Sequence, residues 1–280
     1  MRSNTKMMIE NEYENKYAIA QFNNNNLEWT KYILEECEQL KTPVILGVSE
    51  GAIKYMGGAK VVSNIVTSLI EELNITINVA LHLDHGSSLS VCQDCINAGF
   101  TSVVIDGSHL PLEENINLTK KVVEYAYPRN VTVEGEIGLI GGQEDNISAS
   151  NTNAKLEDVI KFVNETHIDS VAPALGSVHG PYQKEPNLDF DTMKKISNSI
   201  NIPLVLHGGS GIPDTLIKKA IQCGTAKINV NTELQQAWNE GVRDYIKNNP
   251  NVYDPRKIIS SGEKNLKKVV KEKTNLFTNI

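Results

Sequence analysis

The sequence predicts an α/β protein folded as a single (β/α)8 barrel, or TIM barrel, and three observations support this prediction. Apolar segments rich in β-forming residues alternate with helix-length amphipathic segments along the chain. Eight such apolar segments are present, and 280 residues is a usual size for a one-domain barrel. Polar and ionisable residues gather where these segments end, which is where parallel barrels carry their active sites. We therefore expect residues 1–280 to form one domain.

The expected elements follow one another regularly after a polar N-terminal lead-in. We expect strands at residues 17–23, 43–49, 77–85, 102–108, 131–138, 170–176, 203–208 and 226–232. Candidate helices lie between them at residues 27–40, 59–73, 112–127 and 156–166, and the C-terminal tail adds an extra helix at residues 261–274. A doubly wound open sheet is the structural alternative, but no glycine-rich dinucleotide fingerprint follows the first strand.

Composition limits the kinds of partner that the chain can have. The net charge of −7 argues against nucleic acid or an anionic membrane. It is compatible with a small phosphorylated substrate, because backbone amides and one or two cations are enough to hold a phosphate. The sequence shows no apolar run of membrane-spanning length and no secretory leader, so we expect a cytoplasmic protein. Cys92 and Cys95 have a C-x-x-C spacing, but without a second pair or a nearby histidine they do not predict a redox or zinc site.

The sequence LHLDHG at residues 81–86 closes the third expected strand. Its acid and imidazoles suit the floor of a site, with Asp84 as a proton carrier and His85 as a metal ligand. His179 and His207 end the sixth and seventh strands. Three imidazoles that converge on one mouth leave a fourth coordination position open, as in catalytic zinc sites. The alternative is that one or two of these histidines are hydrogen-bonded core residues.

Further acids lie at and after the ends of the fourth and fifth strands. Asp106 and Glu136 would either orient the imidazoles through hydrogen bonds or form a position for a second divalent or a monovalent cation. If they paired with backbone amides instead, they would be inert. The glycine-rich segment 138–145 suits a mobile lid that carries Glu144 as a general base. The alternative is that Glu144 is a solvated loop carboxylate.

Two adjacent loops predict a phosphate cradle. The stretch from His207 to Gly211 reads HGGSG and is expected to present consecutive free amides before a helix. The stretch from Asn229 to Thr232 reads NVNT and leads into another helix. Phosphate sites in barrels lie after strands seven and eight in this way, so two such loops side by side indicate a phosphorylated substrate.

Together these segments resemble the class II, metal-dependent fructose-bisphosphate aldolases. The resemblance covers nearly the whole chain, from Tyr17 to Arg256, and is carried by the stretches LHLDHG, VEGEIG, GGQED, SVHGPY, LHGGSGIP and KINVNTE. It implies reversible aldol cleavage of fructose 1,6-bisphosphate to dihydroxyacetone phosphate and glyceraldehyde 3-phosphate through a zinc-stabilised enediolate. It also implies a homodimer or homotetramer.

The resemblance further implies a role for each residue of the site. Asp84 is the acid/base at the oxygen on C4, and Glu144 moves the proton at the triose-phosphate carbon. The metal ligands implied are the strand-end histidines with two acids for a second position: His85, His179, His207, Asp106 and Glu136. The residues implied to bind the sugar and its phosphates are Asn23, Ser49, Gly180, Lys184, Gly208, Gly209, Ser210, Asn229, Val230, Asn231, Thr232 and, from a neighbouring subunit, Arg256.

Departures from the family pattern leave alternatives open. Gln183 stands where the family usually has a lysine in H-G-x-Y-K, and the lysine follows one residue later as Lys184. Asn231 stands where many relatives have aspartate, so tagatose 1,6-bisphosphate remains an alternative substrate. A metal-dependent barrel hydrolase would have no use for two phosphate cradles, and the retained acids and histidines argue against an inactive sugar-phosphate-binding protein. A Schiff-base aldolase would need a desolvated lysine, for which Lys227 is the candidate.

Overall fold

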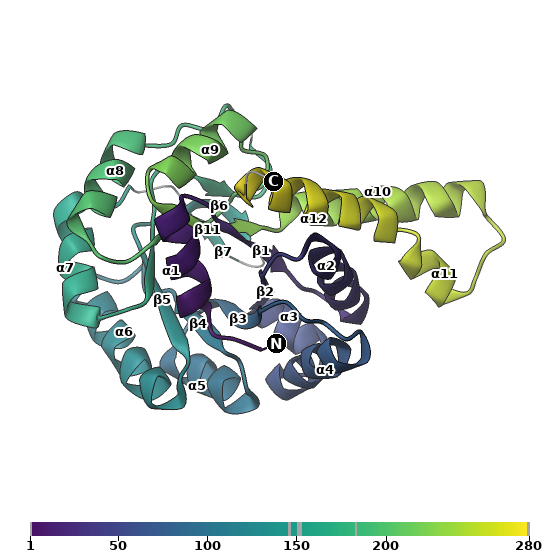
Figure 1. Ribbon diagram of the computed structural model, residues 1–280, viewed down its shortest axis with the longest axis horizontal. Coiled ribbons are helices and arrows are strands. Elements are labelled where there is room, and N and C mark those ends of the chain that lie inside the picture. Colours follow the sequence, from purple (N-terminus) through teal and green to yellow (C-terminus); the bar gives the residue numbers. More distant parts are fainter. Residues whose placement is uncertain (1, 145–146, 150–152, 183, 279–280) are drawn as a thin grey trace.

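Eight parallel strands close into a barrel, as the sequence predicts (Figure 1). The computed structural model describes residues 2–144, 147–149, 153–182 and 184–278. Around the barrel the strands lie in the order β1-β11-β10-β8-β5-β4-β3-β2. Their bounds are β1 Ile19–Asn23, β2 Val44–Ser49, β3 Val79–Gly86, β4 Ser102–Ile105, β5 Thr132–Ile137, β8 Ser170–Pro173, β10 Leu204–Leu206 and β11 Thr225–Val230. The largest differences in length are at β4, β8 and β10, which were expected at residues 102–108, 170–176 and 203–208 and are each three residues shorter.

Helices surround the barrel on the outside (Figure 1). Those that follow strands are α2 Leu27–Leu40, α3 Glu50–Tyr55, α4 Ala59–Glu72, α5 Leu89–Ala98, α6 Leu112–Ala126 with the short 3-10 helix η1 Tyr127–Arg129, α7 Leu156–Thr166, α8 Phe190–Ser199 and α9 Asp214–Gln222. Several begin at side-chain caps; the Asn26 side chain accepts from the Trp29 amide at 2.8 Å, and Ser88 caps α5 in the same way. Their apolar faces pack on the outward-facing side chains of the strands and form the main core.

Alternation along each strand separates this outer core from a polar interior. On β3 the side chains of Val79, Leu81 and Leu83 belong to the outer core. The residues between them point the other way, so His82 and Asp84 are buried inside the barrel. The interior therefore holds ionisable side chains that water does not reach, and each of them needs a protein partner.

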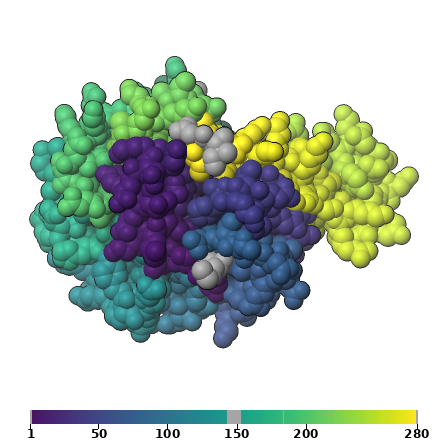
Figure 2. Space-filling view, in the orientation of Figure 1, coloured from purple at the N-terminus to yellow at the C-terminus, as the bar shows by residue number. Residues whose placement is uncertain are grey.

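The N-terminal lead-in, which was expected only as a polar segment, forms a helix, α1 Thr5–Asn15. Apolar and polar residues are poorly separated between the faces of this helix, and for this reason the sequence pattern did not predict it. Met8 and Ile9 of α1 join Ile19, Ile45, Ala80 and Ala226 in a second apolar cluster. The hydroxyl of Thr5 lies 2.7 Å from that of Thr132 at the start of β5. In Figures 1 and 2 this helix, in purple, lies across the near face of the barrel, so we infer that it closes the end opposite the strand carboxyl ends.

A small second sheet lies beyond the barrel strands. It joins β6 Gly141–Glu144, β7 Ile147–Ala149 and β9 Val178–His179 in the order β7-β6-β9. The sequence predicted a glycine-rich loop over residues 138–145, but four of these residues are strand β6. Gly142 pairs with His179, and a Cβ on Gly142 would lie 2.1 Å from the His179 carbonyl oxygen. The glycine is therefore needed for close approach of the two strands as well as for its positive φ of 100°.

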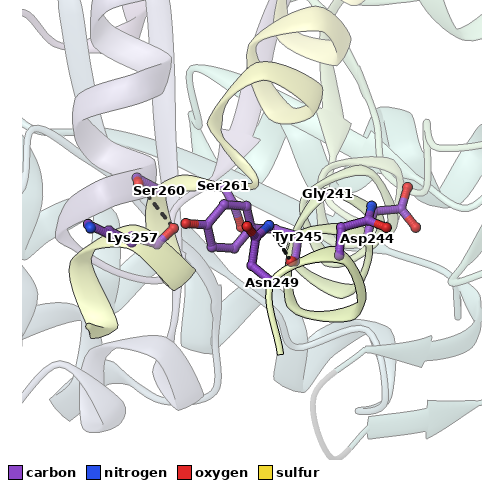
Figure 3. Close-up of a pocket in the computed structure, with 8 residues that line it drawn as sticks. Gly241, Asp244, Tyr245, Asn249, Lys257, Ser260 and Ser261 are labelled. Carbon is purple, nitrogen blue, oxygen red and sulfur yellow. Dashed lines mark hydrogen bonds between the residues drawn. The ribbon is translucent and has the colours of Figure 1, made fainter. Parts of the chain in front are cut away.

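The C-terminal helices form an arm that projects from one side of the barrel (Figures 1 and 2). They are α10 Thr232–Asn248, α11 Pro255–Ser260 and α12 Glu263–Thr278, so the extra helix expected at residues 261–274 exists and is longer. An open groove of about 440 Å³ runs between α10 and α11 and is lined by polar residues that include Asp244, Tyr245 and Lys257 (Figure 3). α12 returns to the barrel, where the carbonyl of Phe277 accepts from the Ala18 amide at 3.1 Å.

Within the described ranges, none of the helices combines the length and apolar character that crossing a bilayer requires.

The two methionines of α1 test its role at the bottom of the barrel. Met8 is 5% exposed, whereas its neighbour Met7 is 76% exposed. We expect Met8→Ala to lower the free energy of unfolding by about 2–4 kcal/mol, because it opens a cavity in the second apolar cluster. Met7→Ala, the matched control on the same helix, should leave it almost unchanged. Urea denaturation of both variants measures the difference, and equal stabilities would show that α1 does not pack on the barrel.

Candidate active site

Three imidazoles from three different strands meet at one place. His85 lies at the end of β3, His179 ends β9, and His207 directly follows β10. The ring centroid of His85 lies 4.9 Å from that of His179 and 4.8 Å from that of His207, and the last two are 5.9 Å apart. One ring nitrogen of each histidine lies within 4.8 Å of the others. The structure thus brings together the three histidines that the sequence selected.

His85 reaches this place through an unusual backbone conformation. Its φ is +51°, in the left-handed region that costs a non-glycine residue of order 1 kcal/mol or more. The pairing of β3 with β4 also shifts its register between Leu83 and Gly86. In a regular strand the side chains of Asp84 and His85 would point to opposite faces of the sheet. The irregularity allows both side chains to reach the mouth of the barrel.

Asp84 is held by two amide side chains. Asn23 donates to one carboxylate oxygen at 2.9 Å, and Asn229 donates to the other at 3.3 Å. Burial raises the pKa of the Asp84 carboxyl, but the nearby histidines and Lys227 outweigh burial and bring the pKa below its ordinary value. Asp84 is therefore a fixed carboxylate beside a candidate metal ligand, as a proton carrier requires. Asn23 and Asn229, expected to contact substrate, orient this carboxylate.

The two further acids form a second group with His85. The Nδ1 atom of His85 lies 3.4 Å from a carboxylate oxygen of Asp106 and 3.5 Å from a carboxylate oxygen of Glu136. Burial raises the pKa of Asp106, but its hydrogen bonds with His85 and Ser108 lower it below the ordinary value. Burial and the charge of Asp106 raise the pKa of Glu136 well above its ordinary value. These two acids and His85 could together hold a cation, as the sequence suggested.

Glu134, one strand alternation before Glu136, was not selected from the sequence and is central to the structure. Its carboxylate accepts from His207 Nε2 at 2.9 Å and from Lys227 Nζ at 2.8 and 3.0 Å. Burial raises the pKa of Glu134, but the charge of Lys227 and the hydrogen bond from His207 bring it below the ordinary value. A possible signal was the VEGE pattern, in which strand alternation directs both glutamates into the barrel.

Lys227 is fully buried, as a Schiff-base lysine would be. Its ammonium group, however, contacts both oxygens of Glu134, so it is not the unpaired amine that such chemistry needs. His82, the other histidine of the LHLDHG segment, is a buried core residue. It hydrogen-bonds Ser102 at 2.8 Å, and burial together with Lys227 lowers its pKa to about 3.

The expected phosphate loop has the predicted glycine geometry but fewer free amides. Gly208 has a φ of +66°, and a Cβ there would lie 2.2 Å from the Val178 carbonyl oxygen. The amide of Gly209 donates to the Asn229 carbonyl at 3.0 Å, so it is not available as expected. The Gly211 amide donates to the Glu233 carboxylate at 2.6 Å.

The loop is also fixed from neighbouring elements. The Ser210 hydroxyl accepts from the amides of Asn231 and Glu233 at 3.2 and 3.4 Å, which joins the loop to the N-terminus of α10. The Tyr182 hydroxyl donates to the Gly208 carbonyl at 3.0 Å and accepts from the Val178 amide at 3.1 Å. Tyr182, which the sequence did not single out, thus ties the strand of His179 to the loop of His207.

The remaining predicted substrate residues occupy varied positions. Ser49 is buried and caps α3 by accepting from the Ala52 amide. Val230 points into the outer core, so only its backbone faces the loops. Thr232 begins α10. Gly180 follows His179 with a φ of +82°.

The two predicted cations lie outside the cluster, and the side chain of the predicted lid acid is outside the described part of the structure. Lys184 is exposed in the segment before α8, and Gln183 lies outside the described residues. Arg256 on α11 is 89% exposed at its side chain and pairs with Asp254 at 2.9 Å. The backbone of Glu144 ends β6, but the side chain is not among those that the structure describes.

The donor set at the mouth fits a divalent metal. Three neutral imidazoles from separate strands are a common ligand set for zinc that leaves a position for substrate. His207 Nδ1 is buried without a hydrogen bond to the described residues, while its Nε2 is held by Glu134. This Nδ1 atom lies 3.3 Å from a carboxylate oxygen of Glu136, on the side of the other candidate ligands. A histidine with one nitrogen fixed by a carboxylate and the other directed toward further ligands is the arrangement found in metal-binding histidines.

Comparisons with known proteins agree with this geometry. A family model described as fructose-bisphosphate aldolase class-II matches residues 3–280. The fructose-bisphosphate aldolase of Geobacillus stearothermophilus is 54% identical over 273 residues, which cover 97% of this chain and 95% of that protein. The Staphylococcus epidermidis fructose-bisphosphate aldolase is 53% identical, with 97% and 96% covered. The crystal structure of the YdjI aldolase from Escherichia coli K12 has a TM-score of 0.86 and 32% identity, and 99% of this chain and 97% of that chain are covered. The chain therefore belongs to the class II fructose-bisphosphate aldolase family.

Proposed function

We propose that the protein is a lyase that cleaves fructose 1,6-bisphosphate reversibly to dihydroxyacetone phosphate and glyceraldehyde 3-phosphate, as a glycolytic enzyme does. The observation that carries this proposal is the meeting of three imidazoles next to the fixed carboxylate of Asp84. The fructose-bisphosphate aldolases to which the chain is more than half identical support the choice of substrate.

The metal of this proposal is zinc, held by His85, His179 and His207. When bound, it supplies Lewis-acid stabilisation of the negative charge that develops on the substrate as the C3–C4 bond breaks. A second cation, divalent or monovalent, could bind between His85, Asp106 and Glu136. Support for both positions comes from the clustering of their donor atoms.

Asp84 takes the proton from the C4 hydroxyl during cleavage and returns it in the reverse direction. The amides of Asn23 and Asn229 hold its carboxylate so that no reorganisation is needed at the moment of transfer. Glu144 moves the proton at the carbon of dihydroxyacetone phosphate. Its place at the end of β6 suits a group carried by a hairpin that covers the substrate.

The loops after β10 and β11 bind the phosphate of the triose half. Ser210, Asn231 and the start of α10 support this role, because a helix N-terminus favours an anion. Gly180 and Lys184 extend the cradle on the side of His179, and Ser49 borders the far half of the substrate.

The active form in this proposal is a homo-oligomer in which the whole chain acts as one domain. The arm projects from the barrel and carries the exposed side chains of Tyr253, Ile246 and Arg256, which suits contact with a second copy. The cytoplasm is the proposed location, and the four free thiols at Cys37, Cys92, Cys95 and Cys223 agree with a reducing compartment.

A coupled cleavage assay tests the substrate and the metal together. We expect a higher kcat/KM for fructose 1,6-bisphosphate than for tagatose 1,6-bisphosphate, loss of activity with a strong chelator, and recovery on adding zinc. A preference for the tagatose epimer would instead assign the alternative substrate, to which Asn231 drew attention. Cleavage that persists in the presence of the chelator would contradict the metal-dependent mechanism and would favour a Schiff-base mechanism on Lys227.

Isotope exchange separates the roles of the two acids. Asp84→Ala should abolish cleavage but still exchange the C–H proton of dihydroxyacetone phosphate, because the lid acid remains. Glu144→Ala should lose that exchange while it binds the triose phosphate almost normally. Each general acid–base step is worth about 10²–10⁴-fold in rate. Deuterium exchange followed by NMR measures both variants, and exchange at the wild-type rate in Glu144→Ala would show that this side chain is not the base.

Mixing of inactive protomers tests whether Arg256 serves a neighbouring subunit. Asp84→Ala and Arg256→Ala chains should each be inactive alone, and their mixture should regain activity, because some sites then combine an intact acid with an intact arginine. Arg243→Ala on the same arm is the control and should behave as wild type. If subunits exchange and no activity returns, Arg256 does not complete a neighbour's site.

A further inference from the structure

A chain of three buried side chains crosses the interior of the barrel. Lys227 on β11 contacts both carboxylate oxygens of Glu134 on β5, at 2.8 and 3.0 Å. Glu134 in turn lies 2.9 Å from His207 Nε2. All three side chains are at most 2% exposed. The middle of β5, the middle of β11 and the residue directly after β10 are therefore connected by short polar contacts.

We propose that Glu134, held in place by Lys227, is a positioning residue that fixes the ring orientation and tautomer of His207 and so presents its Nδ1 atom to the metal. This inference rests on the proposed function, in which His207 is a metal ligand. Glu134 itself contacts neither substrate nor metal.

The direction of the ring follows from its neighbours. The carboxylate of Glu134 can only accept, so His207 must carry its proton on Nε2. The other nitrogen, Nδ1, lies 3.3 Å from Glu136, which also lies 3.5 Å from His85. The unprotonated nitrogen of His207 is thus on the side where the other candidate ligands gather. An Nδ1-protonated ring would present a hydrogen to the metal in place of a lone pair.

Lys227 explains why Glu134 keeps its orientation. A carboxylate that touched only an imidazole could rotate about its terminal bond, but the ammonium group engages both oxygens at once. The hydroxyl of Ser170 lies 3.3 Å from the oxygen that faces away from His207. Lys227 therefore influences the proposed metal position indirectly, through the hydrogen-bonded side chains of Glu134 and His207.

Two matched double variants separate positioning from simple structural support. Both contain Lys227→Met, which removes the buried ammonium, so neither leaves an unpaired charge in the core. Glu134→Gln/Lys227→Met keeps an acceptor for His207, because the amide oxygen can face Nε2–H while the amide nitrogen donates to Ser170. Glu134→Leu/Lys227→Met removes that acceptor. The two proteins thus differ in whether residue 134 can hydrogen-bond to the ring of His207 and to Ser170.

The readout is metal affinity, measured by competition with a chromogenic zinc chelator, together with the visible absorption of the cobalt-substituted proteins. We expect the leucine variant to bind zinc about 10–100-fold more weakly than the glutamine variant, with an altered cobalt spectrum. The glutamine variant should bind zinc more weakly than the wild-type protein, because it lacks the lysine that holds residue 134 in place, but more tightly than the leucine variant. Equal affinities and equal spectra in the two variants would overturn the proposal.

Two further measurements keep this test independent of folding and of the proposed function. In the zinc-loaded wild-type protein with ¹⁵N-labelled histidine, His207 should carry its proton on Nε2 and bind metal through Nδ1. Metal bound through Nε2 would overturn the proposal even if both double variants failed to fold. His179→Ala reports on the function itself, because stoichiometric zinc in that variant would contradict the three-histidine site, whatever Glu134 does.

Discussion

The pairing of charges inside a closed barrel is the constraint on which the rest of this structure depends. Water does not reach Lys227, Glu134 or Asp84, so each of these groups is stable only with partners of fixed geometry. Those partners come from different strands, and they can meet only if the strands keep their order and register. The interactions that hold the charges therefore also hold the reactive groups in place, since Glu134 contacts both Lys227 and His207, and the amides of Asn23 and Asn229 hold Asp84. Removing one member would disturb both the fold and the site.

Much of the fold could be predicted because its signals are local. Each strand appears as a short run of β-formers, and polar residues at the strand ends gave the three histidines and Asp84 directly. Helix α1 was missed because its burial depends on Met8 and Ile9 reaching an apolar cluster built from distant strands. Strand β9 has only two residues, and its pairing with β6 is not visible in either segment alone. Such contacts depend on tertiary packing, which periodicity does not report.

The site shows the same division between local and distant information. Sequence spacing assigned His85 to the mouth, but not the left-handed backbone that turns it there beside Asp84. Glu134 and Lys227 are 93 positions apart, and each is unremarkable in its own segment. The amide of Gly209 was expected to be free, but it donates to the carbonyl of Asn229 on β11. Sequence therefore identified the groups that carry chemistry better than the groups that hold them.

The contact between Gly142 and His179 links two events that are usually considered separately. The hairpin formed by β6 and β7, whose first strand ends at Glu144, is joined through its backbone to the short strand that carries a candidate metal ligand. A metal that binds to His179 in one position would then stabilise the docked hairpin. By linkage, the docked hairpin would raise the affinity for the metal by the same free energy. Opening of the hairpin to release product would consequently weaken the hold on the metal. In the proposed enzyme, turnover and metal retention would therefore be coupled equilibria, and a substitution that loosens the hairpin would be recognised by metal loss during catalysis.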